Sequence, residues 1–336
     1  MNFARRARHR VDRCPADSTR PCPRERGGTR RLRLRQQGDD SPVSDVTVGI
    51  DIGGTATRIV VVRGTQIVAS TIVSTPTVRN DALPTLLSSI RAVMASAPGA
   101  EGEMSRVGIG ASGPILAGGV IDNPESLPAL SGWNFVDRLG ELLGVDCRID
   151  NDAVTAALAE VTVGAGRLDT GVLVMTLGTG VGVALMRSGI PFRGADGVHP
   201  EAGHITVDAP SSPCYCGRRH CLEQTASRTA LQRLATHAGF PADLEVLAHA
   251  ASEGDPGAQR VFLEYGTRIG EGLGELCTQH RPTIVVLGGS AATYLPHFRS
   301  GVEGALAALT SAPVPALRQT ALGDLGGALG AALLWQ

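Results

Sequence analysis

The sequence predicts an internally duplicated α/β protein with two lobes and a cleft between them. A strand, a glycine turn and a returning strand occur near residue 50 and again near residue 178. In each copy these elements are followed by segments with helical or strand periodicity. The length of 336 residues suffices for two domains of ordinary size, which we assign to residues 46–150 and 151–336.

The first half opens with three consecutive strands. An apolar run from Val46 ends in the turn Asp51-Ile-Gly-Gly-Thr55, and the runs 58–63 and 66–73 are joined at Gly64. The later elements expected in this half are a helix over 82–97, a strand over 107–111, a helix over 133–143, a short strand over 147–149 and an Ala-rich helix over 152–163.

The second half repeats the opening pattern. A continuous apolar strand over 172–177 meets the turn Gly178-Thr179-Gly180, and a returning strand covers 181–186. The later elements expected here are a helix over 262–277, a buried strand over 283–287 that stops at Gly288-Gly289, and a helix over 325–334.

The composition is typical of a soluble enzyme. Hydrophobic residues make up 43% of the chain but aromatic residues only 3%, so the core must consist mainly of aliphatic side chains. No apolar run approaches the roughly 20 residues that a membrane span needs, and we expect none. Seven cysteines are an odd number, and three of them cluster, which favours a reducing cytoplasm over a disulfide framework.

Residues 1–45 form a separate Arg/Pro-rich extension that we expect to be disordered. Its first 36 residues contain twelve arginines and three acids, against a net charge of −1 for the whole chain. A nucleic-acid arm, a targeting segment and upstream sequence without a structural role are all open interpretations, and we favour the last. A signal peptide would need an apolar core segment, and frequent prolines weaken an amphipathic import helix.

A cluster of metal-ligand residues lies between two acids, Glu201 and Glu223. Its members are His204, Cys214, Cys216 and Cys221. Zinc prefers tetrahedral nitrogen and sulfur ligation, so the cluster predicts a structural zinc site in a loop over 204–223. The metal would fix the two carboxylates on a rigid scaffold. The alternative is that three reduced cysteines are close together by chance.

The two glycine turns are candidate phosphate sites. Each turn exposes backbone N–H groups at the end of a strand, and Thr55 or Thr179 adds a hydroxyl donor. Together they predict a nucleotide clamp, with Asp51 beside the hydration shell of a magnesium ion. Glycine-rich hairpins are also common without a ligand. The Walker pattern is absent, the chain contains no lysine, and a strand after Gly178 excludes a Rossmann fingerprint.

Asn151-Asp152 lies where a short strand meets a helix. Asp152 has a structural explanation as the helix N-cap. If its carboxylate faces the cleft instead, it can accept the proton of a sugar hydroxyl that attacks a γ-phosphate.

These motifs, in this order, resemble the ROK family of repressors, open reading frames and sugar kinases. The resemblance covers residues 46–336 and rests on Asp51-Ile-Gly-Gly-Thr55, Gly110-Ala-Ser-Gly-Pro114, Asn151-Asp-Ala153, Gly178-Thr-Gly180, Glu201-Ala-Gly-His204, Cys214-x-Cys-Gly-x-x-x-Cys-Leu-Glu223 and Leu287-Gly-Gly289.

The resemblance implies an actin-like, ribonuclease-H-type fold with ATP and magnesium in the cleft and a hexose between the lobes. It also implies a homodimer or homotetramer. Asp152 would be the catalytic base, and Gly288 and Gly289 would lie near the adenosine. The residues implied to contact sugar hydroxyls are Asn151, Glu201, His204 and Glu223, with His204 also a zinc ligand.

The chain departs from the family pattern at three places. Ala56 stands where family members often have Lys, and His220 replaces a usual Gly, as a spare ligand or a solvated side chain. Ser126 stands where an Asn usually reads the sugar, which leaves glucose specificity open. The run Val198-His-Pro-Glu201 is similar to the fructokinase branch, whereas the cysteine motif is similar to the glucokinase branch.

We therefore expect an ATP-dependent kinase that phosphorylates a hexose or amino-hexose at its 6-hydroxyl, with closure of the lobes excluding water. Glucose, kanosamine and N-acetyl-hexosamine types are candidate substrates, and a fructokinase is an alternative. A sugar-responsive ROK regulator is another alternative, although residues 1–45 are too short and too poor in apolar residues for a helix-turn-helix domain, which makes nucleic-acid binding a weak candidate. A catalytically silent sugar-binding module is a third.

Overall fold

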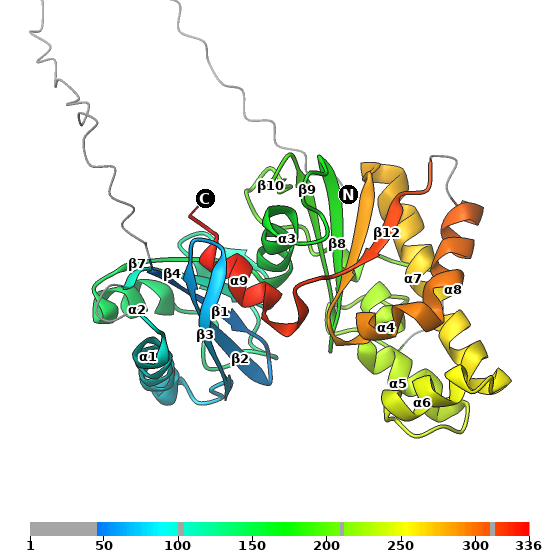
Figure 1. The fold of residues 1–336 in the computed structure, drawn as a ribbon, viewed down its shortest axis with the longest axis horizontal. Coiled ribbons are helices and arrows are strands. Elements are labelled where there is room, and N and C mark those ends of the chain that lie inside the picture. The colour runs from blue at the N-terminus through cyan, green and yellow to red at the C-terminus, as the bar shows by residue number, and fades with distance from the viewer. Residues whose placement is uncertain (1–45, 100–103, 209–211, 310–312, 336) are drawn as a thin grey trace, which may run out of the picture. The chain divides into compact units, whose positions relative to one another are not determined.

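The computed structural model describes residues 46–99, 104–208, 212–309 and 313–335. The expectation for residues 1–45 lies outside this range. Contacts group residues 44–336 as one compact unit. Within it, two mixed β-sheets and their helices give an α/β fold, as the sequence predicts (Figure 1).

The first sheet has the strand order β3-β2-β1-β4-β7. Strand β1 pairs antiparallel with β2 and parallel with β4, while β2 pairs antiparallel with β3 and β4 parallel with β7. The bounds are β1 (Val46–Ile52), β2 (Ala56–Arg63), β3 (Gln66–Ser74), β4 (Met104–Ala111) and β7 (Asp146–Asn151). A small hairpin of β5 (Ile115–Leu116) and β6 (Val120–Ile121) follows β4.

The second sheet repeats this topology in the order β10-β9-β8-β11-β12. Strand β8 is antiparallel to β9 and parallel to β11, β9 is antiparallel to β10, and β11 is parallel to β12. The bounds are β8 (Gly171–Leu177), β9 (Val181–Arg187), β10 (Ile190–Pro191), β11 (Ile284–Gly288) and β12 (Ala316–Gln319). The five strand directions therefore agree between the sheets, position by position.

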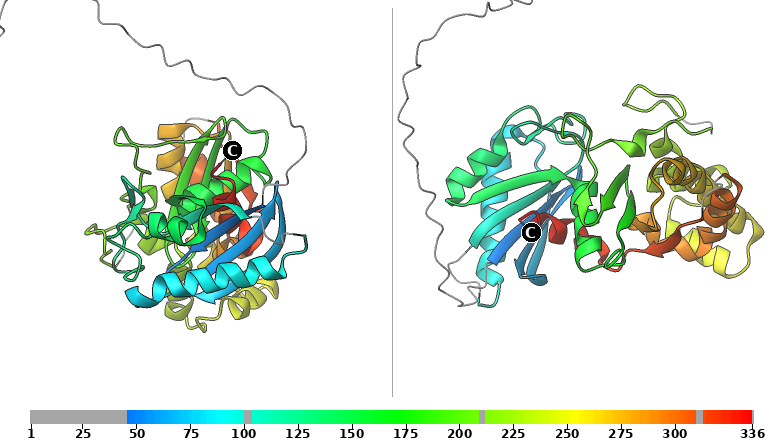
Figure 2. Two further views of the ribbon diagram at one scale, coloured as in Figure 1. Left: turned by 90° about the vertical axis from the view of Figure 1, so that its left-hand side faces the viewer. Right: turned by 90° about the horizontal axis from the view of Figure 1, so that it is seen from above.

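Each sheet packs against its own helices. Buried side chains of α1 (Arg79–Ser96) and α2 (Phe135–Leu143) join the first sheet in one core cluster. The second sheet shares a core with α7 (Pro256–His280) and α8 (Leu295–Leu309), which run beside each other in Figures 1 and 2. This second core also includes α4 (Leu222–Ala226), α5 (Arg228–His237) and α6 (Leu244–Ser252).

Two helices connect the sheets. Helix α9 (Gly326–Ala332) packs against β1 and β4 of the first sheet, although it comes last in the chain. Helix α3 (Asp152–Thr162) packs against β8 and β9 of the second sheet, and the two helices also contact each other. Residues before β8 and after β12 thus tie each sheet to the other.

The sequence expectations and the structure differ mainly in the helices between β10 and β12. The strands and glycine turns lie within a few residues of their expected places, and α2 begins at Phe135 because the Asn134 side chain caps it. The sequence patterns predict none of the helices α4, α5, α6 and α8, and none of the strands β5, β6, β10 and β12. None of the described helices is long and apolar enough to cross a membrane.

Candidate active site

The junction of β7 and α3 presents Asn151 and Asp152. The Asn151 side-chain oxygen accepts a hydrogen bond from the Ala153 N–H at 2.9 Å, so Asn151 is the N-cap of α3. Asp152 is the first helical residue, and its Oδ1 also accepts from that N–H, at 2.8 Å. Asn151, and not Asp152, is therefore the N-cap of α3, so capping does not explain why an acid stands at position 152.

Three predicted site acids influence one another. Burial, opposed by hydrogen bonds from backbone N–H groups and reinforced by Glu223, raises the pKa of Asp152 to about 6. Burial, then Asp152 and Glu223, raise the pKa of Glu201 to about 7. The charge of Glu223 thus acts on Asp152, and the charges of both act on Glu201, so the fold brings Asp152, Glu201 and Glu223 near one another from three distant segments.

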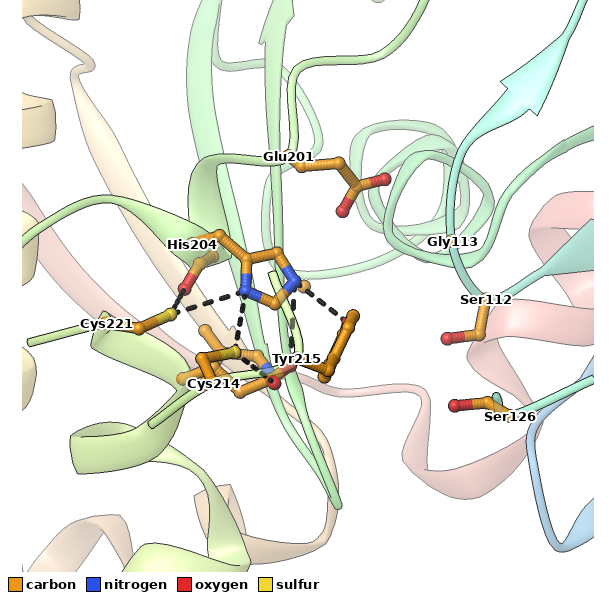
Figure 3. A network of polar contacts seen from close by, with 12 residues as sticks. Ser112, Gly113, Ser126, Glu201, His204, Cys214, Tyr215 and Cys221 are labelled. Carbon is orange, nitrogen blue, oxygen red and sulfur yellow. Dashed lines mark hydrogen bonds and ion pairs between the residues drawn. The ribbon is translucent and has the colours of Figure 1, made fainter. Parts of the chain in front are cut away.

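Asn151 also lies between two walls of the site. Its amide nitrogen donates to the Gly113 carbonyl at 3.1 Å and approaches Glu201 Oε1 at 3.5 Å. In Figure 3 the side chain of Glu201 and the hydroxyls of Ser112 and Ser126 lie opposite one another. Ser126, which stands where the family usually has Asn, thus lies across from Glu201.

The four predicted zinc ligands do come together. Their ligand atoms all lie within 4.8 Å of one another, in the group His204, Cys214, Cys216 and Cys221. His204 directs Nδ1 at this group, 3.3 Å from Cys221 Sγ and 3.6 Å from Cys214 Sγ (Figure 3). His220 is not a member of the group.

A tight turn presents the first two cysteines. The Gly217 N–H donates to the Cys214 carbonyl at 3.0 Å, and Gly217 has φ +82°, which favours glycine. The Arg218 guanidinium donates to the His204 carbonyl at 2.6 Å and fixes the turn to the histidine. One imidazole and three thiols in this arrangement fit the donor set of a structural zinc ion.

Glu223 joins the cysteine cluster to the second glycine turn. It lies in the first turn of α4 and is buried. Its Oε2 accepts from the Val181 N–H at 3.2 Å and lies 4.0 Å from His204 Nε2, while Cys214 Sγ lies 3.7 Å from its Oε1. A change in the cluster would therefore be transmitted to this carboxylate.

The two glycine turns are anchored by different partners. In the first, the Thr75 hydroxyl donates to the Gly53 carbonyl at 2.6 Å, and the Thr75 N–H to the Thr55 carbonyl at 3.1 Å. In the second, the Gly178 carbonyl accepts from the N–H of Arg228, the first residue of α5, at 2.8 Å. Gly54, Thr55 and Thr179 are exposed, as a phosphate site requires.

Asp51 connects the first turn with the candidate base. Burial is the main cause that raises its pKa to about 7, and the nearby charge of Asp152 raises it further. Arg58, with Nη1 4.0 Å from Asp51 Oδ2, opposes this shift. A divalent cation beside these acids would stabilise their charged forms.

Gly288 and Gly289 end β11 next to β8. Gly289 has φ +78°, and a Cβ there would lie 2.6 Å from the Leu177 backbone nitrogen, so the close crossing needs glycine. A cavity of about 370 Å³ opens directly after it. Its lining residues are Arg228, Gln232, Ala242, Asp243, Leu244, Glu245, Ser290, Thr293, Tyr294 and Asp324.

Two residues near the site were not among those that the sequence analysis singled out. The Tyr215 hydroxyl lies 2.9 Å from His204 Nε2, with the rings edge to face, and the Glu223 and Glu201 charges add to burial in raising its pKa. Thr75 reaches Gly53 across 22 residues. Tyr215 stands inside the Cys-x-Cys motif, which was the one available hint, whereas Thr75 belongs to no local pattern.

Comparisons with known proteins agree with this arrangement. Residues 47–336 match the ROK family. An N-acetyl-D-glucosamine kinase of Erwinia tasmaniensis is 32% identical over 85% of this chain and 98% of its own length. An N-acetylgalactosamine kinase of Shewanella sp. (strain ANA-3) is 34% identical over 69% of this chain and 79% of its own.

A solved structure is similar over the same region. It is a ROK family glucokinase from Streptomyces griseus in complex with glucose and AMPPNP, with 27% sequence identity and a TM-score of 0.72. The match covers 86% of this chain and 98% of that one. The α/β fold with two mixed sheets is therefore the fold of a ROK sugar kinase.

Proposed function

This chain belongs to the ROK family and is an ATP-dependent kinase of a hexose or amino-hexose, and we propose that Asp152 is its general base. The single observation that carries this role is the placement of Asp152 at the start of α3, half-buried, where the charge of Glu223 raises its pKa and its own charge raises the pKa of Glu201 and Asp51. With a pKa of about 6, the carboxylate is mostly ionised at pH 7 and still basic enough to accept a proton.

The sugar would lie among the polar groups around Asp152. Asn151, Glu201 and Glu223 are directed by the β7 end, the segment before η1 (Ala202–His204) and α4. His204 would offer the sugar its Nε2 in place of the Tyr215 hydroxyl that now lies 2.9 Å from it, since Nδ1 faces the sulfurs. These groups would orient the 6-hydroxyl toward Asp152, and orientation is a large part of catalysis in phosphoryl transfer.

The acids also bear on the choice of sugar. Carboxylates accept hydrogen bonds from neutral hydroxyls, and an ammonium group would make charge-assisted bonds that are roughly twice as strong. Glu201 and Glu223 therefore support amino-hexoses as substrates alongside neutral hexoses. Both of the relatives compared by sequence are named for N-acetylated amino sugars, whose neutral amide N–H would donate an ordinary hydrogen bond to such a carboxylate rather than a charge-assisted one.

The nucleotide would occupy the side of the site lined by glycine. Backbone N–H groups of the turns at Gly53-Gly54-Thr55 and Gly178-Thr179-Gly180 would hold phosphate oxygens. The cavity after Gly288-Gly289 suits the adenosine in position and polarity. Asp51 would hold magnesium through its hydration shell, and the ion would neutralise charge on the phosphates.

The Cys/His group would hold a structural zinc ion. His204 Nδ1 and the thiolates of Cys214, Cys216 and Cys221 supply four ligands of the type that zinc prefers. The ion would stiffen the loop 204–223 and, through Cys214 and His204, the position of Glu223. Reduced thiols and use of ATP support a cytoplasmic location, which we include in the proposal.

A coupled assay of ADP release tests the function. The panel contains glucose, fructose, mannose, 2-amino and 3-amino hexoses and N-acetyl hexosamines, each with ATP and magnesium. At least one hexose or amino-hexose should raise ADP release far above the rate with ATP alone. Fructose as the best substrate would favour the fructokinase alternative, and sugar binding without turnover on any member would favour the silent module.

A further inference from the structure

A buried ion pair lies directly behind the β7–α3 junction. One oxygen of the Asp150 carboxylate accepts from the Asn151 N–H at 2.8 Å, and the other pairs with the Arg193 guanidinium. The Asp150 side chain is 11% exposed and that of Arg193 is 32% exposed, so water shields this pair less than an ordinary surface pair. Asp150 thus holds the backbone of Asn151 and a distant segment at once.

A neutral histidine closes the pair on one side. His199 is buried, and burial, assisted by Arg193, lowers its pKa to about 4 although Asp150 acts in the opposite direction. Its Nδ1 has no hydrogen-bond partner within the part of the chain that the structure describes. Because His199 carries no charge at neutral pH, the cation that faces Asp150 is Arg193.

The segment that carries Arg193 leads along the chain to Glu201, and short-range hydrogen bonds close it as far as Val198. It begins at Phe192, whose N–H donates to the Leu185 carbonyl of β9 at 2.8 Å. Within it, the Gly194 N–H donates to the Val198 carbonyl at 2.9 Å, and the Val198 N–H donates to Asp196 at 3.0 Å. A turn closed in this way can pass the position of Arg193 on to Glu201.

We infer that Arg193 and Asp150 are a positioning pair that sets Glu201 against Asn151 and Asp152, an inference that rests on the proposed kinase function. The direct contact between Asn151 Nδ2 and Glu201 Oε1, at 3.5 Å, is at the limit of a hydrogen bond and too weak to fix the spacing alone. The ion pair acts on both sides of that contact. Neither Arg193 nor Asp150 is among the residues that we assign to the sugar or the nucleotide, so the pair would act through those residues.

Four variants of the full-length protein test the pair. Arg193→Met removes the cation, Asp150→Asn keeps an acceptor for the Asn151 N–H, and the double variant combines them. Arg193→Lys restores the charge. The matched control is Arg318→Met, which breaks another long-range ion pair, with Asp169 at 3.4 Å. Each variant is measured for kcat, for the KM of sugar and of ATP, and for thermal stability.

The positioning role predicts a selective loss. A displacement on the order of 1 Å costs about 100-fold in rate, so kcat/KM for the sugar should fall by about that factor in Arg193→Met, while the KM for ATP stays within about twofold. Arg193→Lys should recover most of the loss. The double variant should be no worse than the worse single variant, since both remove one interaction. Arg318→Met should lose stability without this loss in kcat/KM.

Other results would overturn the inference. They are an unchanged kcat/KM for the sugar, effects that multiply in the double variant, or equal losses for sugar and ATP that follow the folded fraction. If the wild type binds a sugar without phosphorylating it, the proposed function fails. The positioning role is then tested by the sugar affinity of each variant, measured by calorimetry, which should fall in the same order as kcat/KM is expected to fall. A wild type that binds no sugar overturns both.

Discussion

Strands β7 and β12 hold equivalent outer places in two sheets of the same topology, yet their carboxyl ends differ in chemistry. Strand β7 ends in Asn151 and runs into Asp152, which faces other acids. Strand β12 is followed by Thr320, whose hydroxyl contacts the buried carboxylate of Glu160. The two sheets thus end in equivalent strands, of which one leads into the acid that we propose as the base and the other into a threonine that satisfies a buried carboxylate.

A second difference lies in the chain beyond the outer antiparallel strand of each sheet. In the first sheet, β3 leads within a few residues to α1. In the second, a long segment after β10 carries Glu201, the cysteine cluster and Glu223 before α7 begins. Glu201, His204 and Glu223, which we assign to the sugar, thus come from a segment that has no counterpart in the first sheet, whereas Asn151 ends a repeated strand and the residues assigned to phosphate lie in the repeated turns.

The strongest test of the β7 end is Asp152→Asn. Removal of a general base costs about 100-fold to 10,000-fold, so kcat should fall by about 1,000-fold. The melting temperature should hardly change, because the Asn151 side chain still caps α3. Asp255→Asn, which keeps the cap of α7, is the matched control and should leave kcat unchanged. If Asp152→Asn kept more than about a tenth of the wild-type activity, Asp152 would not be the general base, and the proposed difference between the β7 and β12 ends would be lost.

The variant Cys216→Ser tests whether the cysteine cluster after β10 supports the sugar site. Loss of one ligand should remove zinc, as measured by metal analysis, and raise the KM for sugar by about 10-fold to 100-fold because Glu223 and His204 lose their support. The KM for ATP should change by less than about threefold. Cys147→Ser is the control, since Cys147 is a free thiol at the start of β7 outside the cluster. Full zinc content with a normal sugar KM would contradict the account.

The pH dependence of kcat tests whether Asp152, at the end of β7, acts in its ionised form. A base must be ionised to accept a proton, and the pKa of Asp152 is about 6. The rate should therefore rise with pH through about 6 and level off above pH 7, with a value at pH 5 about tenfold below the plateau. Rates measured from pH 5 to 8 at saturating substrates check this. A rate that falls as pH rises through 6 would exclude an ionised carboxylate as the base.

The repeated turns are compared by Thr55→Ala and Thr179→Ala. Each removes one hydroxyl donor, worth about 0.5–1.5 kcal/mol, so each should raise the KM for ATP by about 2-fold to 10-fold and leave the sugar KM unchanged. Thr236→Ala, on the exposed side of α5, is the control. An effect at only one turn would show that the duplication of sequence is not a duplication of function.

The smallest effect on activity is expected at the β12 end. Thr320→Val removes a hydrogen bond to the buried Glu160, which should lower the free energy of unfolding by about 1 to 2 kcal/mol. The rate should change by less than about twofold, because the lost contact is structural. Denaturant unfolding and steady-state kinetics on the same preparation measure both. A large fall in kcat would mean that the two strand ends are less different than proposed.

Much of the sheet architecture was predictable because short stretches of neighbouring residues determine it. The apolar runs that became β1, β8 and β11 and the glycines that end them need only a few neighbouring residues to be recognised. The cysteine cluster was equally local, since three ligands lie within eight residues, Cys214–Cys221. Contacts such as Asp150 with Arg193 or Thr75 with Gly53 join segments far apart and leave no such pattern.

The helices of the second half were harder to predict from the sequence. Helix α8 packs against α7, and its sequence contains several glycines and alanines whose value depends on the close approach of the partner. Helix α4 is only five residues long, and it is held by Tyr265, which donates to the Ala226 carbonyl at 2.7 Å. Such elements are stabilised by tertiary packing rather than by intrinsic propensity, so sequence periodicity alone does not reveal them.

The most direct measurement tracks the phosphoryl group itself. ATP labelled in its γ-phosphate is incubated with the best sugar of the panel and either wild-type protein or Asp152→Asn, and the product is located by phosphorus NMR. The wild type should yield a sugar 6-phosphate, and the variant almost none at equal sugar binding. Label released as inorganic phosphate by the wild type, or equal product from both proteins, would contradict it.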